Sequence, residues 1–465
     1  MRPIEQSCYW LATRQANPSR PQAVDARCDV AIIGGGLTGL WTALFLKELS
    51  PRTEVVLLEA NTLAYGASGR NAGMLSETID HSHALAIQHF GEQEARRLAL
   101  LGQKNVDEMV AWLAKNRIDC EMELTGRLMV ALTDGQLAEC SRTVATAERL
   151  GVTNHRMLTA KETRARLDSP LYLGGVHVAG GGILNPVKLV EGLRCEAERL
   201  GVRVFEKTKV ESIRRQAHGV AVHSAPCTLH PAPSVLHAAR VVLATNAYSH
   251  HLFPRLLRRF IPLYDYILVS DPVPPAQLAT IGWEGREGVT DGRTFFNYYR
   301  LTRDNRILWG TSEATYYRGN EVSPARDHSP AHYQSLRESF ARHFPRFGPI
   351  GFPFAWGGPI AATTRMTPFF GSLENGRVVY GLGYTGHGLG TTRLAGQVLA
   401  HLALERPSDL TKLPLVTHRP FPYPPEPFRG RAVQAVTQAL RRVDQGKPPS
   451  PLLRILQALG IGFSS

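Results

Sequence analysis

Short apolar runs and helically spaced apolar residues alternate near the start of the chain. Residues 30–33 form a run short enough for a buried parallel strand, and residues 37–49 place apolar side chains at helical spacing. A second short run, EVVLLEA at residues 54–60, again predicts a buried strand. Glycines separate the first strand from the helix. The pattern therefore predicts a βαβ unit.

Helical and strand-like segments continue over most of the chain. Helical spacing is found over residues 91–113, 134–150 and 187–201, and strand-like runs over residues 124–132, 202–213 and 239–248. A β-rich region follows at residues 260–309, where a turn at residues 303–305 predicts a hairpin. The chain then returns to a strand, a glycine-rich turn and a helix expected over residues 391–404.

The segment after Pro407 differs in composition. The proline-rich stretch THRPFPYPPEPFRGR precedes two short segments, residues 431–443 and 451–459, whose pattern predicts amphipathic helices. Such helices suit a membrane surface or a partner protein, but here the apolar stripe is short. We therefore expect this basic tail, residues 406–465, to pack on the body of the protein as a lid.

Length and composition fit a globular protein of two domains. The 465 residues are 43% hydrophobic and 20% charged. No apolar run reaches the length of about 18 residues that a membrane-spanning helix needs. The stretch MRPIEQSCYWLATRQ lacks an apolar signal core, which favours a cytoplasmic location. Six cysteines without CxxC spacing predict reduced thiols and no metal site.

The net charge of +13 could attract anionic substrates, nucleic acids or acidic membranes. The basic residues are nevertheless dispersed, without a long basic run and with few interleaved aromatic residues. We therefore do not expect nucleic-acid binding.

A GxGxxG pattern made by Gly34, Gly36 and Gly39 joins the first predicted strand to its helix. The pattern alone is weak, but a dinucleotide pyrophosphate binds at such a position. Gly34 permits the turn, Gly36 lets the pyrophosphate approach and Gly39 lets helix and strand pack. The helix N-terminus attracts the phosphate charge. Glu59 ends the second strand and can accept hydrogen bonds from an adenosine ribose, which disfavours NADP.

The next loop distinguishes FAD from NAD. GASGRNAGML, residues 66–75, follows the second strand almost at once, where an NAD domain would continue into another helix. Its small residues could lie along an extended cofactor, with Ser68, Arg70 and Asn71 as polar donors. We expect Arg70 near the pyrophosphate and Gly73 under a flat ring. The loop therefore favours FAD.

Five motifs together resemble the D-amino-acid oxidase superfamily of FAD-dependent amine oxidoreductases: DVAIIGGGLTGL, LLEA, GASGRNAG, VVLATNAY and GLGYTGHGLGTTRLAG. Within it, ASGRN is similar to the γ-glutamylputrescine oxidase group. The resemblance implies an α/β plus α+β fold, in which a glutathione-reductase-type, Rossmann-like FAD-binding domain is interleaved with an antiparallel-sheet substrate domain. We accordingly assign residues 1–90, 155–250 and 350–405 to the FAD-binding domain, and residues 91–154 and 251–349 to the substrate domain.

The resemblance also implies a reaction and its partners. A carbon next to the nitrogen of a small amine, which could be anionic, gives a hydride to flavin N5, and the imine hydrolyses to a carbonyl compound. Reoxidation by O2 gives H2O2, with another electron acceptor as the alternative. Two departures from the resemblance are informative. Some members of the superfamily, the monomeric sarcosine oxidases, tether the flavin through a cysteine in the C-terminal part; no cysteine follows Cys227 here, which favours non-covalent FAD. Those enzymes also use a lysine over the flavin to activate O2; no lysine lies between Lys209 and Lys412, which argues against rapid reaction with O2.

The late glycine-rich stretch, residues 383–396, is expected to hold the flavin ring. Reduced flavin carries negative charge at N1 and at the C2 carbonyl, where aimed dipoles stabilise it. Backbone N–H groups of residues 386–390 and the N-terminus of the next helix supply such dipoles. Glycines are needed because the backbone itself must touch the cofactor. Thr391 or Thr392 could cap the helix.

The predicted cofactor-binding residues come from the three glycine-rich loops and from five positions between them. They are Gly34, Gly36, Leu37, Thr38, Gly39, Glu59, Ala60, Ala67, Ser68, Gly69, Arg70, Asn71, Gly73, Met74, Val210, Thr245, Asn246, Gly383, Gly386, His387, Gly388, Leu389 and Gly390. We expect the backbone of Gly388 and Gly390 to be firmer flavin contacts than the His387 imidazole.

Three residues are candidates for catalysis or substrate binding: His387, Arg300 and Tyr298. His387 could act as a base or orient the amine, or be a structural histidine turned away. Arg300 could pair with a substrate carboxylate or phosphonate, or be a solvated strand residue. Tyr298 is one of several aromatic residues on strand-like runs, about half of which face inward. The others are Tyr264, Tyr266, Tyr299, Trp309 and Trp356.

Two other functions remain as alternatives. A flavoenzyme that modifies RNA would need a contiguous basic face near the flavin. A flavoprotein without turnover would have a closed or filled pocket.

Overall fold

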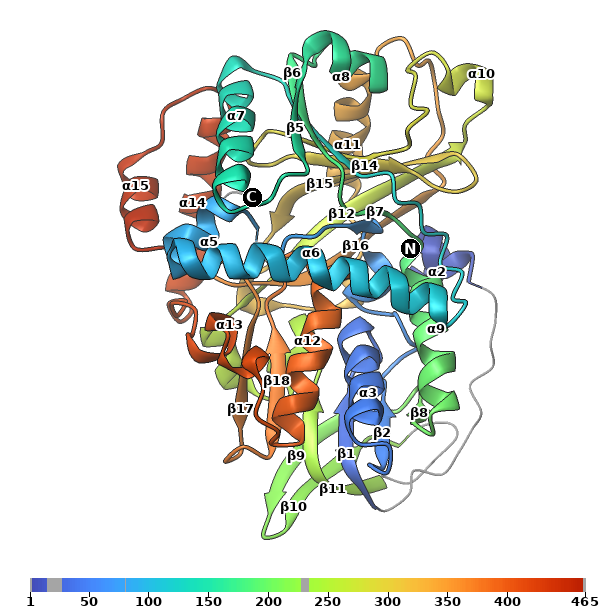
Figure 1. The fold of residues 1–465 in the computed structure, drawn as a ribbon, viewed down its shortest axis with the longest axis vertical. Coiled ribbons are helices and arrows are strands. Elements are labelled where there is room, and N and C mark those ends of the chain that lie inside the picture. The colour runs from blue at the N-terminus through green and yellow to red at the C-terminus, as the bar shows by residue number, and fades with distance from the viewer. Residues whose placement is uncertain (1, 15–26, 80, 227–233, 463–465) are drawn as a thin grey trace.

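The structure is a computed structural model that describes residues 2–14, 27–79, 81–226 and 234–462. Two eight-stranded sheets form its framework, one in each half of the molecule (Figure 1). The strands of the first sheet are β1 (Arg27–Ile33), β2 (Val55–Leu58), β8 (Arg203–Phe205), β9 (Val210–Gln216), β10 (Gly219–Ser224), β11 (Ser234–Leu243), β17 (Phe369–Leu373) and β18 (Val378–Leu382). Their order is β17-β18-β11-β1-β2-β8, with β10 and then β9 attached to β11.

The centre of the first sheet is parallel. β18, β11, β1, β2 and β8 run in the same direction, which their short apolar runs predict. Parallel strands carry their C-terminal loops at one edge of the sheet. The loops that follow β1, β2, β11 and β18 therefore meet at the same edge, although residues 34 and 386 are far apart in the sequence.

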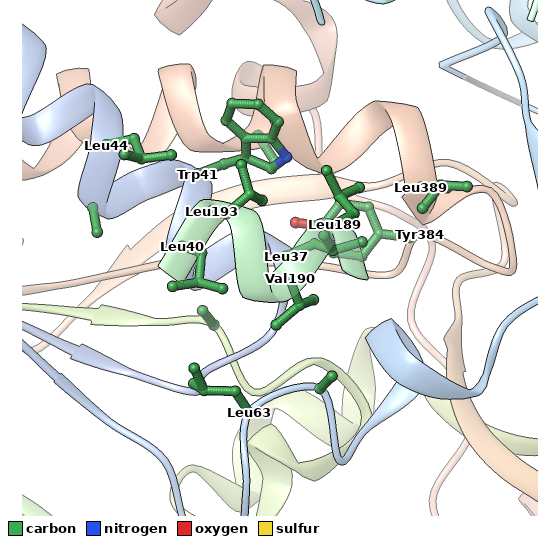
Figure 2. Packing of buried hydrophobic residues seen from close by; sticks show 14 of the residues in the cluster. Leu37, Leu40, Trp41, Leu44, Leu63, Leu189, Val190, Leu193, Tyr384 and Leu389 are labelled. Carbon is green, nitrogen blue, oxygen red and sulfur yellow. The ribbon is translucent and has the colours of Figure 1, made fainter. Parts of the chain in front are cut away.

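Three helices cover one face of this sheet: α3 (Leu37–Leu49), α9 (Pro186–Arg199) and α12 (Gly388–Ala403) (Figure 1). Figure 2 shows Leu40 and Trp41 of α3 with Leu193 of α9 in the shared core. Trp41 is fully buried, and a Cβ on Gly396 of α12 would lie 2.7 Å from the backbone carbonyl carbon of Trp41. The glycine thus lets α12 lie directly against α3.

The second sheet is mainly antiparallel. Its strands are β4 (Arg127–Ala131), β5 (His155–Thr159), β6 (Gly174–Val178), β12 (Ile261–Pro272), β13 (Gly288–Asp291), β14 (Asn297–Leu301), β15 (Arg306–Thr315) and β16 (Phe354–Ala362), in the order β16-β12-β15-β14-β13-β4-β6-β5. Only the β13–β4 pair is parallel among these neighbours. Helix α11 (Pro330–His343) packs on its outer face. The predicted combination of a Rossmann-like and an antiparallel sheet is confirmed.

A long helix, α6 (Glu92–Lys115), crosses the middle of the molecule between the two sheets (Figure 1). It has 24 residues, but neither it nor any other helix in the described ranges is both long and apolar enough to cross a membrane. The remaining helices and strands are α1 (Ile4–Ser7), α2 (Tyr9–Ala12), α4 (Ala67–Arg70), β3 (Met74–Leu75), α5 (His83–Phe90), α7 (Asp134–Arg149), α8 (Ala160–Arg166), β7 (Gly182–Ile183), α10 (Pro275–Leu278), α13 (Pro414–Thr417), α14 (Phe428–Asp444) and α15 (Pro451–Ala458).

Most predicted helices and strands are confirmed to within a few residues. The βαβ unit, the helices α6, α7 and α9, and the hairpin of β14 and β15 all lie where the sequence pattern places them. Helix α12 begins at Gly388 rather than at Thr391. The helix starts earlier because residues 388–390, two of them glycines, already adopt helical geometry directly after the turn.

Two predicted domain boundaries need correction. Strand β5 pairs with β6, and β6 pairs with β4 in the second sheet, whereas the sequence boundaries place residues 155–250 in the FAD-binding domain. Strand β16 pairs with β12, although it falls in the predicted FAD-binding segment 350–405. An apolar run identifies a strand but not its partner, because sheet pairing depends on contacts that are distant in sequence.

The C-terminal tail packs on the second sheet, as the lid interpretation requires. The carboxylate of Asp444 in α14 accepts hydrogen bonds from the backbone N–H of Thr294 (2.7 Å) and of Phe295 (2.9 Å). The buried guanidinium of Arg429 donates to Asn320 Oδ1 at 2.7 Å. Both ends of α14 are therefore fixed to the body of the protein.

We expect Gly39→Ala to destabilise the protein, because a Cβ at this position would lie 2.1 Å from the carbonyl oxygen of Gly34. Overpacking of this kind costs about 1–3 kcal/mol in the free energy of unfolding. The control is Gly135→Ala in the first turn of α7, where the nearest atom to a Cβ is Thr133 Oγ1 at 3.9 Å. That change should be neutral or stabilising by up to about 1 kcal/mol. Urea unfolding measures both, and equal midpoints would contradict the close approach.

Candidate functional site

One cavity of about 730 Å³ lies where the loops of the first sheet meet the second sheet. The loop after β1, the segment 65–76 and the loop before α12 line one side of it. Inner-face residues of β12 and β14 line another. Helix α14 adds apolar side chains, among them Val436 and Leu440. The cavity thus unites segments from the whole length of the chain.

The first glycine loop approaches the end of β11 closely. Gly34 has a φ of +111°, and a Cβ there would lie 2.7 Å from the carbonyl oxygen of Ala244. Only glycine fits this turn. Helix α3 then starts without a side-chain cap, and the N–H of Leu37 donates to Ser68 Oγ at 2.9 Å. Gly36 and Leu37 line the cavity, so the helix N-terminus is placed as a pyrophosphate site requires.

Glu59 follows β2 and lines the same cavity. Its two carboxylate oxygens accept hydrogen bonds from the N–H groups of Gly35 and Asn61, each at 2.8 Å. Burial raises the pKa of Glu59, and these two hydrogen bonds partly offset the shift. A carboxylate offers about four acceptor sites. Acceptor capacity therefore remains for the hydroxyl groups of a ribose.

The second loop is shaped by Asn71. Its amide nitrogen donates to the carbonyl oxygens of Ala67 (3.0 Å) and Ser68 (2.9 Å), and its Oδ1 accepts from the N–H of Gly73 at 2.8 Å. Gly73 has a φ of +70°, and a Cβ there would lie 2.2 Å from the carbonyl oxygen of Leu184. Asn71 therefore uses its side chain to fold the loop, while both Asn71 and Gly73 line the cavity.

Arg70 joins this loop to the second sheet. Its buried guanidinium lies 2.7 Å from Asp327 Oδ1, and its Nη1 donates to the carbonyl oxygen of Gly357 at 3.1 Å. Nε donates to the carbonyl oxygen of Tyr65 at 2.7 Å. Only Nη2 is buried without a partner among the described residues. We expected the guanidinium of Arg70 at the pyrophosphate, but most of its N–H donors already bind protein groups. Arg70 does line the cavity.

Arg300 does not line the cavity, which corrects its predicted role as a ligand for a substrate anion. The guanidinium is buried and donates to the carbonyl oxygens of Gly73 (2.9 Å), Leu184 (2.6 Å) and Leu301 (2.9 Å). Burial lowers the pKa of Arg300 to about 9. Its long side chain passes beneath the second loop and holds Gly73 from the side of the second sheet.

The late loop runs from β18 through residues 383–387 into α12. Gly386 and Gly388 line the cavity, and Gly386 has a φ of +89°. Gly390, which we predicted as a flavin contact, lies outside the cavity lining. A Cβ on Gly390 would lie 2.8 Å from the carbonyl oxygen of Ser76, and its own carbonyl oxygen accepts from Asn105 at 2.9 Å. Gly390 thus serves helix packing.

His387 lines the cavity beside a second histidine that the sequence analysis did not identify, His81. The two rings lie 4.1 Å apart between centroids. Burial, then the proximity of His81 and Arg127, lowers the pKa of His387 well below its usual value. His387 is therefore uncharged at neutral pH, and its Nδ1 has no partner among the described residues. His81 is also uncharged, because burial lowers its pKa to about 4.

Side chains alternate between the two faces of the second sheet, so only some of the predicted aromatic residues face the cavity. Leu263, Asp265 and Ile267 of β12 line the cavity, as does Tyr298 of β14. The other tyrosines and Trp309 lie in a separate core under α11: Tyr264, Tyr266, Tyr299 and Trp309. Trp356 is fully buried, and its indole N–H donates to the carbonyl oxygen of Arg70 at 3.0 Å. Tyr298 is thus the only predicted aromatic residue that reaches the cavity.

The sequence analysis missed two charged residues of the cavity wall, Asp265 and Arg127. Asp265 Oδ2 accepts from the hydroxyl of Tyr298 at 2.5 Å, and burial raises the pKa of Asp265 to about 7. Arg127 has a buried Nε without a hydrogen-bond partner among the described residues, and burial lowers its pKa. Each is a lone charged residue in an apolar strand, LYDYIL or GRLMV, a signal that could have identified both.

Most predicted site residues come together at this cavity. Those that line it are Gly34, Gly36, Leu37, Thr38, Glu59, Ala60, Ala67, Ser68, Arg70, Asn71, Gly73, Met74, Val210, Thr245, Asn246, Tyr298, Gly386, His387, Gly388 and Leu389. Those that do not are Gly39, Gly69, Gly383, Gly390 and Arg300. Of these, Gly39 and Gly69 permit close backbone packing. A Cβ on Gly39 would lie 2.1 Å from the carbonyl oxygen of Gly34, and a Cβ on Gly69 would lie 2.3 Å from that of Ala64.

A parallel sheet with a GxGxxG loop, an acidic residue after the second strand and a long cavity against an antiparallel sheet define a dinucleotide-binding oxidoreductase fold. The sequence matches the family model DAO, FAD dependent oxidoreductase, over residues 29–402. The chain therefore belongs to this family, FAD is its cofactor, and the family resemblance read from the five motifs is confirmed.

The chain is 31% identical over 400 residues to gamma-glutamylputrescine oxidoreductase of Escherichia coli. The aligned region covers 85% of this chain and 88% of that one. The chain is 30% identical over 429 residues to the probable oxidoreductase OrdL of Rhizobium meliloti, covering 90% and 94%. Glycine oxidase from Geobacillus kaustophilus has a similar fold, with a TM-score of 0.69 at 21% identity, covering 84% and 98%. L-proline dehydrogenase from P. horikoshii follows with a TM-score of 0.66 at 18% identity, covering 84% and 96%.

The cysteines agree with FAD that is held without a thioether link. The described cysteines are Cys8, Cys28, Cys120, Cys140 and Cys195, and none of them lines the cavity. Cys227 lies outside the described residues. The uncapped start of α3 and the glycine cradles of the first two loops fit the pyrophosphate and the body of the cofactor.

We expect Asp327→Asn to lower the free energy of unfolding by about 3–5 kcal/mol, because it leaves the buried charge of Arg70 without its counter-ion. The side chains of this pair are 2% and 5% exposed. The control is Asp409→Asn, which breaks an ion pair with Lys412. The side chains of Asp409 and Lys412 are 81% and 71% exposed. That change should cost less than about 1 kcal/mol. Urea unfolding of the two holoproteins tests this, and a small effect of Asp327→Asn would show that Arg70 does not depend on the carboxylate.

Proposed function

We propose that the protein oxidises a small amine or amino acid at the carbon next to nitrogen, releasing a carbonyl compound after hydrolysis of the imine. One observation carries the proposal: a single cavity joins the three FAD loops to the inner face of the second sheet, where ionisable side chains are exposed to it. The names of relatives support an amine substrate, since gamma-glutamylputrescine, glycine and L-proline all contain one.

Bound FAD supplies the acceptor for the electron pair of the C–H bond. The chain's own part is to hold the amine, exclude water and stabilise charge. Gly388 and Leu389 line the cavity at the N-terminus of α12, which brings the positive end of the helix dipole and its unpaired N–H groups to this part of the wall. The N–H of His387 is not among them, because it donates to the carbonyl oxygen of Tyr384 at 2.9 Å. His387, being uncharged, can accept a hydrogen bond from the amine.

Arg127 takes the place of Arg300 in this proposal as the ligand for an anionic group on the substrate. It lines the cavity, and the unpartnered Nε leaves donor capacity there. A buried guanidinium in a low-dielectric site favours a carboxylate partner strongly. The charge of Glu77 acts on Arg127 and raises its pKa, partly offsetting the effect of burial. Glu77 itself accepts a hydrogen bond from Asn154 at 2.7 Å.

The electron acceptor is either O2, giving H2O2, or another oxidant. Lys209 is the only lysine among the described lining residues. It follows Thr208, whose N–H donates to the carbonyl oxygen of Glu59 at 2.8 Å, so it belongs to the ribose end of the proposed FAD site. This placement supports slow reaction with O2.

Anaerobic addition of a substrate amine should bleach the FAD absorption of the holoenzyme, because reduced flavin does not absorb at the oxidised band. A panel of primary and secondary amines and amino acids tests this, with air readmitted to measure reoxidation. Some distant relatives are named L-2-hydroxyglutarate dehydrogenase, so 2-hydroxy acids form the comparison panel. Bleaching by hydroxy acids alone would overturn the proposal in favour of CH–OH oxidation.

Arg127→Met should raise KM for an amine that carries a carboxylate by about 10- to 150-fold. This factor corresponds to the loss of one hydrogen bond to a charged group. The substitution should leave KM for an alkylamine without a carboxylate nearly unchanged. The control is Arg156→Met on β5, whose side chain is 57% exposed and pairs with Glu162. Steady-state kinetics at matched FAD content measure both, and an equal loss for both amine types would assign Arg127 a structural role.

A further inference from the structure

Asp265 lies in the middle of β12, on the face that lines the cavity. Its neighbours on the same face, Leu263 and Ile267, are apolar. The ring of Phe296 lies 6.3 Å from that of Tyr298 and also lines the cavity. A carboxyl group is thus set between apolar neighbours on its own strand.

The carboxyl group is oriented from two sides. Oδ2 accepts from the hydroxyl of Tyr298 at 2.5 Å, and Oδ1 accepts from the N–H of Tyr266 at 2.7 Å. Both donors are neutral. Because a carboxylate offers about four acceptor sites, roughly half of its capacity remains available towards the cavity.

Other buried carboxylates of the second sheet have an arginine partner. Asp291 pairs with Arg293 at 2.6 Å, and Glu287 pairs with Arg166. No cation pairs with Asp265 among the described residues. The sheet therefore neutralises its buried carboxylates except the one that faces the cavity, where a ligand can do so.

The charged groups around Asp265 are already paired with others. Gly358 of β16 lies opposite it and is covered by Arg70, whose charge is paired with Asp327 at 2.7 Å. On β15, Glu313 pairs with Arg441 of α14. At the far end of β15, Arg306 pairs with Asp304 at 2.7 Å. The hydroxyl of Tyr298 is the titratable group in direct contact with Asp265.

We propose that Asp265, oriented by Tyr298, is the counter-ion for the ammonium group of an alkylamine substrate. The inference rests on the proposed function and names its substrate class, a protonated primary or secondary amine with a hydrocarbon chain. The ammonium group donates to the free acceptor sites of Asp265, and the chain contacts Ile267 and Phe296. Val436 and Leu440 of α14 extend the apolar wall of the same cavity.

The ligand for the test is the tert-butylammonium ion, which has no C–H bond next to nitrogen and so cannot be oxidised. Titration into the holoenzyme is followed by the change in FAD absorption, with tert-butanol as the uncharged ligand of the same shape. Asp265→Asn should weaken binding of the ion by about 10- to 150-fold and leave that of the alcohol unchanged. Tyr298→Phe should cause a smaller loss, also confined to the ion.

The control variant is Asp271→Asn, at an exposed position farther along β12 that does not line the cavity. It should bind both ligands as the wild type does. Binding of the ion to Asp265→Asn with unchanged affinity, or equal losses for ion and alcohol, would overturn the proposal.

The pH dependence gives a second test that needs no variant. An alkylammonium ion stays protonated below about pH 10, so the carboxyl group decides the affinity. Because the pKa of Asp265 is about 7, affinity for the ion should fall as pH drops below that value, when the carboxyl group becomes neutral. A flat profile in the wild type would overturn the proposal. Since this ligand does not turn over, a holoenzyme that no amine bleaches would fail the proposed function without deciding this inference.

Discussion

Two buried arginines hold the second glycine-rich loop, residues 66–75, against the second sheet, and the cavity depends on them. Arg70 reaches from the loop to Asp327 and to the carbonyl oxygen of Gly357. Arg300 reaches the opposite way, from β14 to the carbonyl oxygen of Gly73. Each guanidinium is at most 3% exposed. A charge buried this deeply destabilises the fold unless these partners are in place. The reciprocal contacts fix the distance between the loop and the inner face of the sheet, and with it the space for cofactor and substrate.

The remaining cavity charges contrast with this pattern. Asp265 and Arg127 are half-buried in the cavity wall, yet neither has an ion-pair partner within the described residues. An unpaired buried charge costs several kcal/mol, and shifted pKa values concentrate at functional sites for this reason. Arg70 has its counter-ion in Asp327, and Arg300 has three backbone carbonyl acceptors. Asp265 and Arg127, by contrast, face the cavity without an ion-pair partner among the described residues.

Sequence reasoning identified the glycine loops and most elements, because they depend on local requirements. Gly34 is needed for a φ of +111°, and residues 37–49 carry an unbroken helical pattern. It did not identify the sheet that contains β5 and β6, since strand pairing is non-local. It also placed Arg70 and Arg300 by residue type alone. A long side chain can reach in several directions, and only the fold shows that Arg300 turns to Gly73.

The tail gives the cavity a wall that the family match does not include. The match ends at residue 402, whereas α14 begins at Phe428 and contributes Val433, Val436 and Leu440 to the lining. Asp444 fixes the end of this helix to the backbone of residues 294 and 295, directly before Phe296 of the inner face. The apolar side chains of α14 are thus positioned by the loop that leads into β14, the strand that carries Tyr298. The three predicted FAD loops lie within the matched residues 29–402, whereas α14 lies outside them. Substitutions in α14 could therefore change the apolar wall of the cavity without altering the cofactor loops.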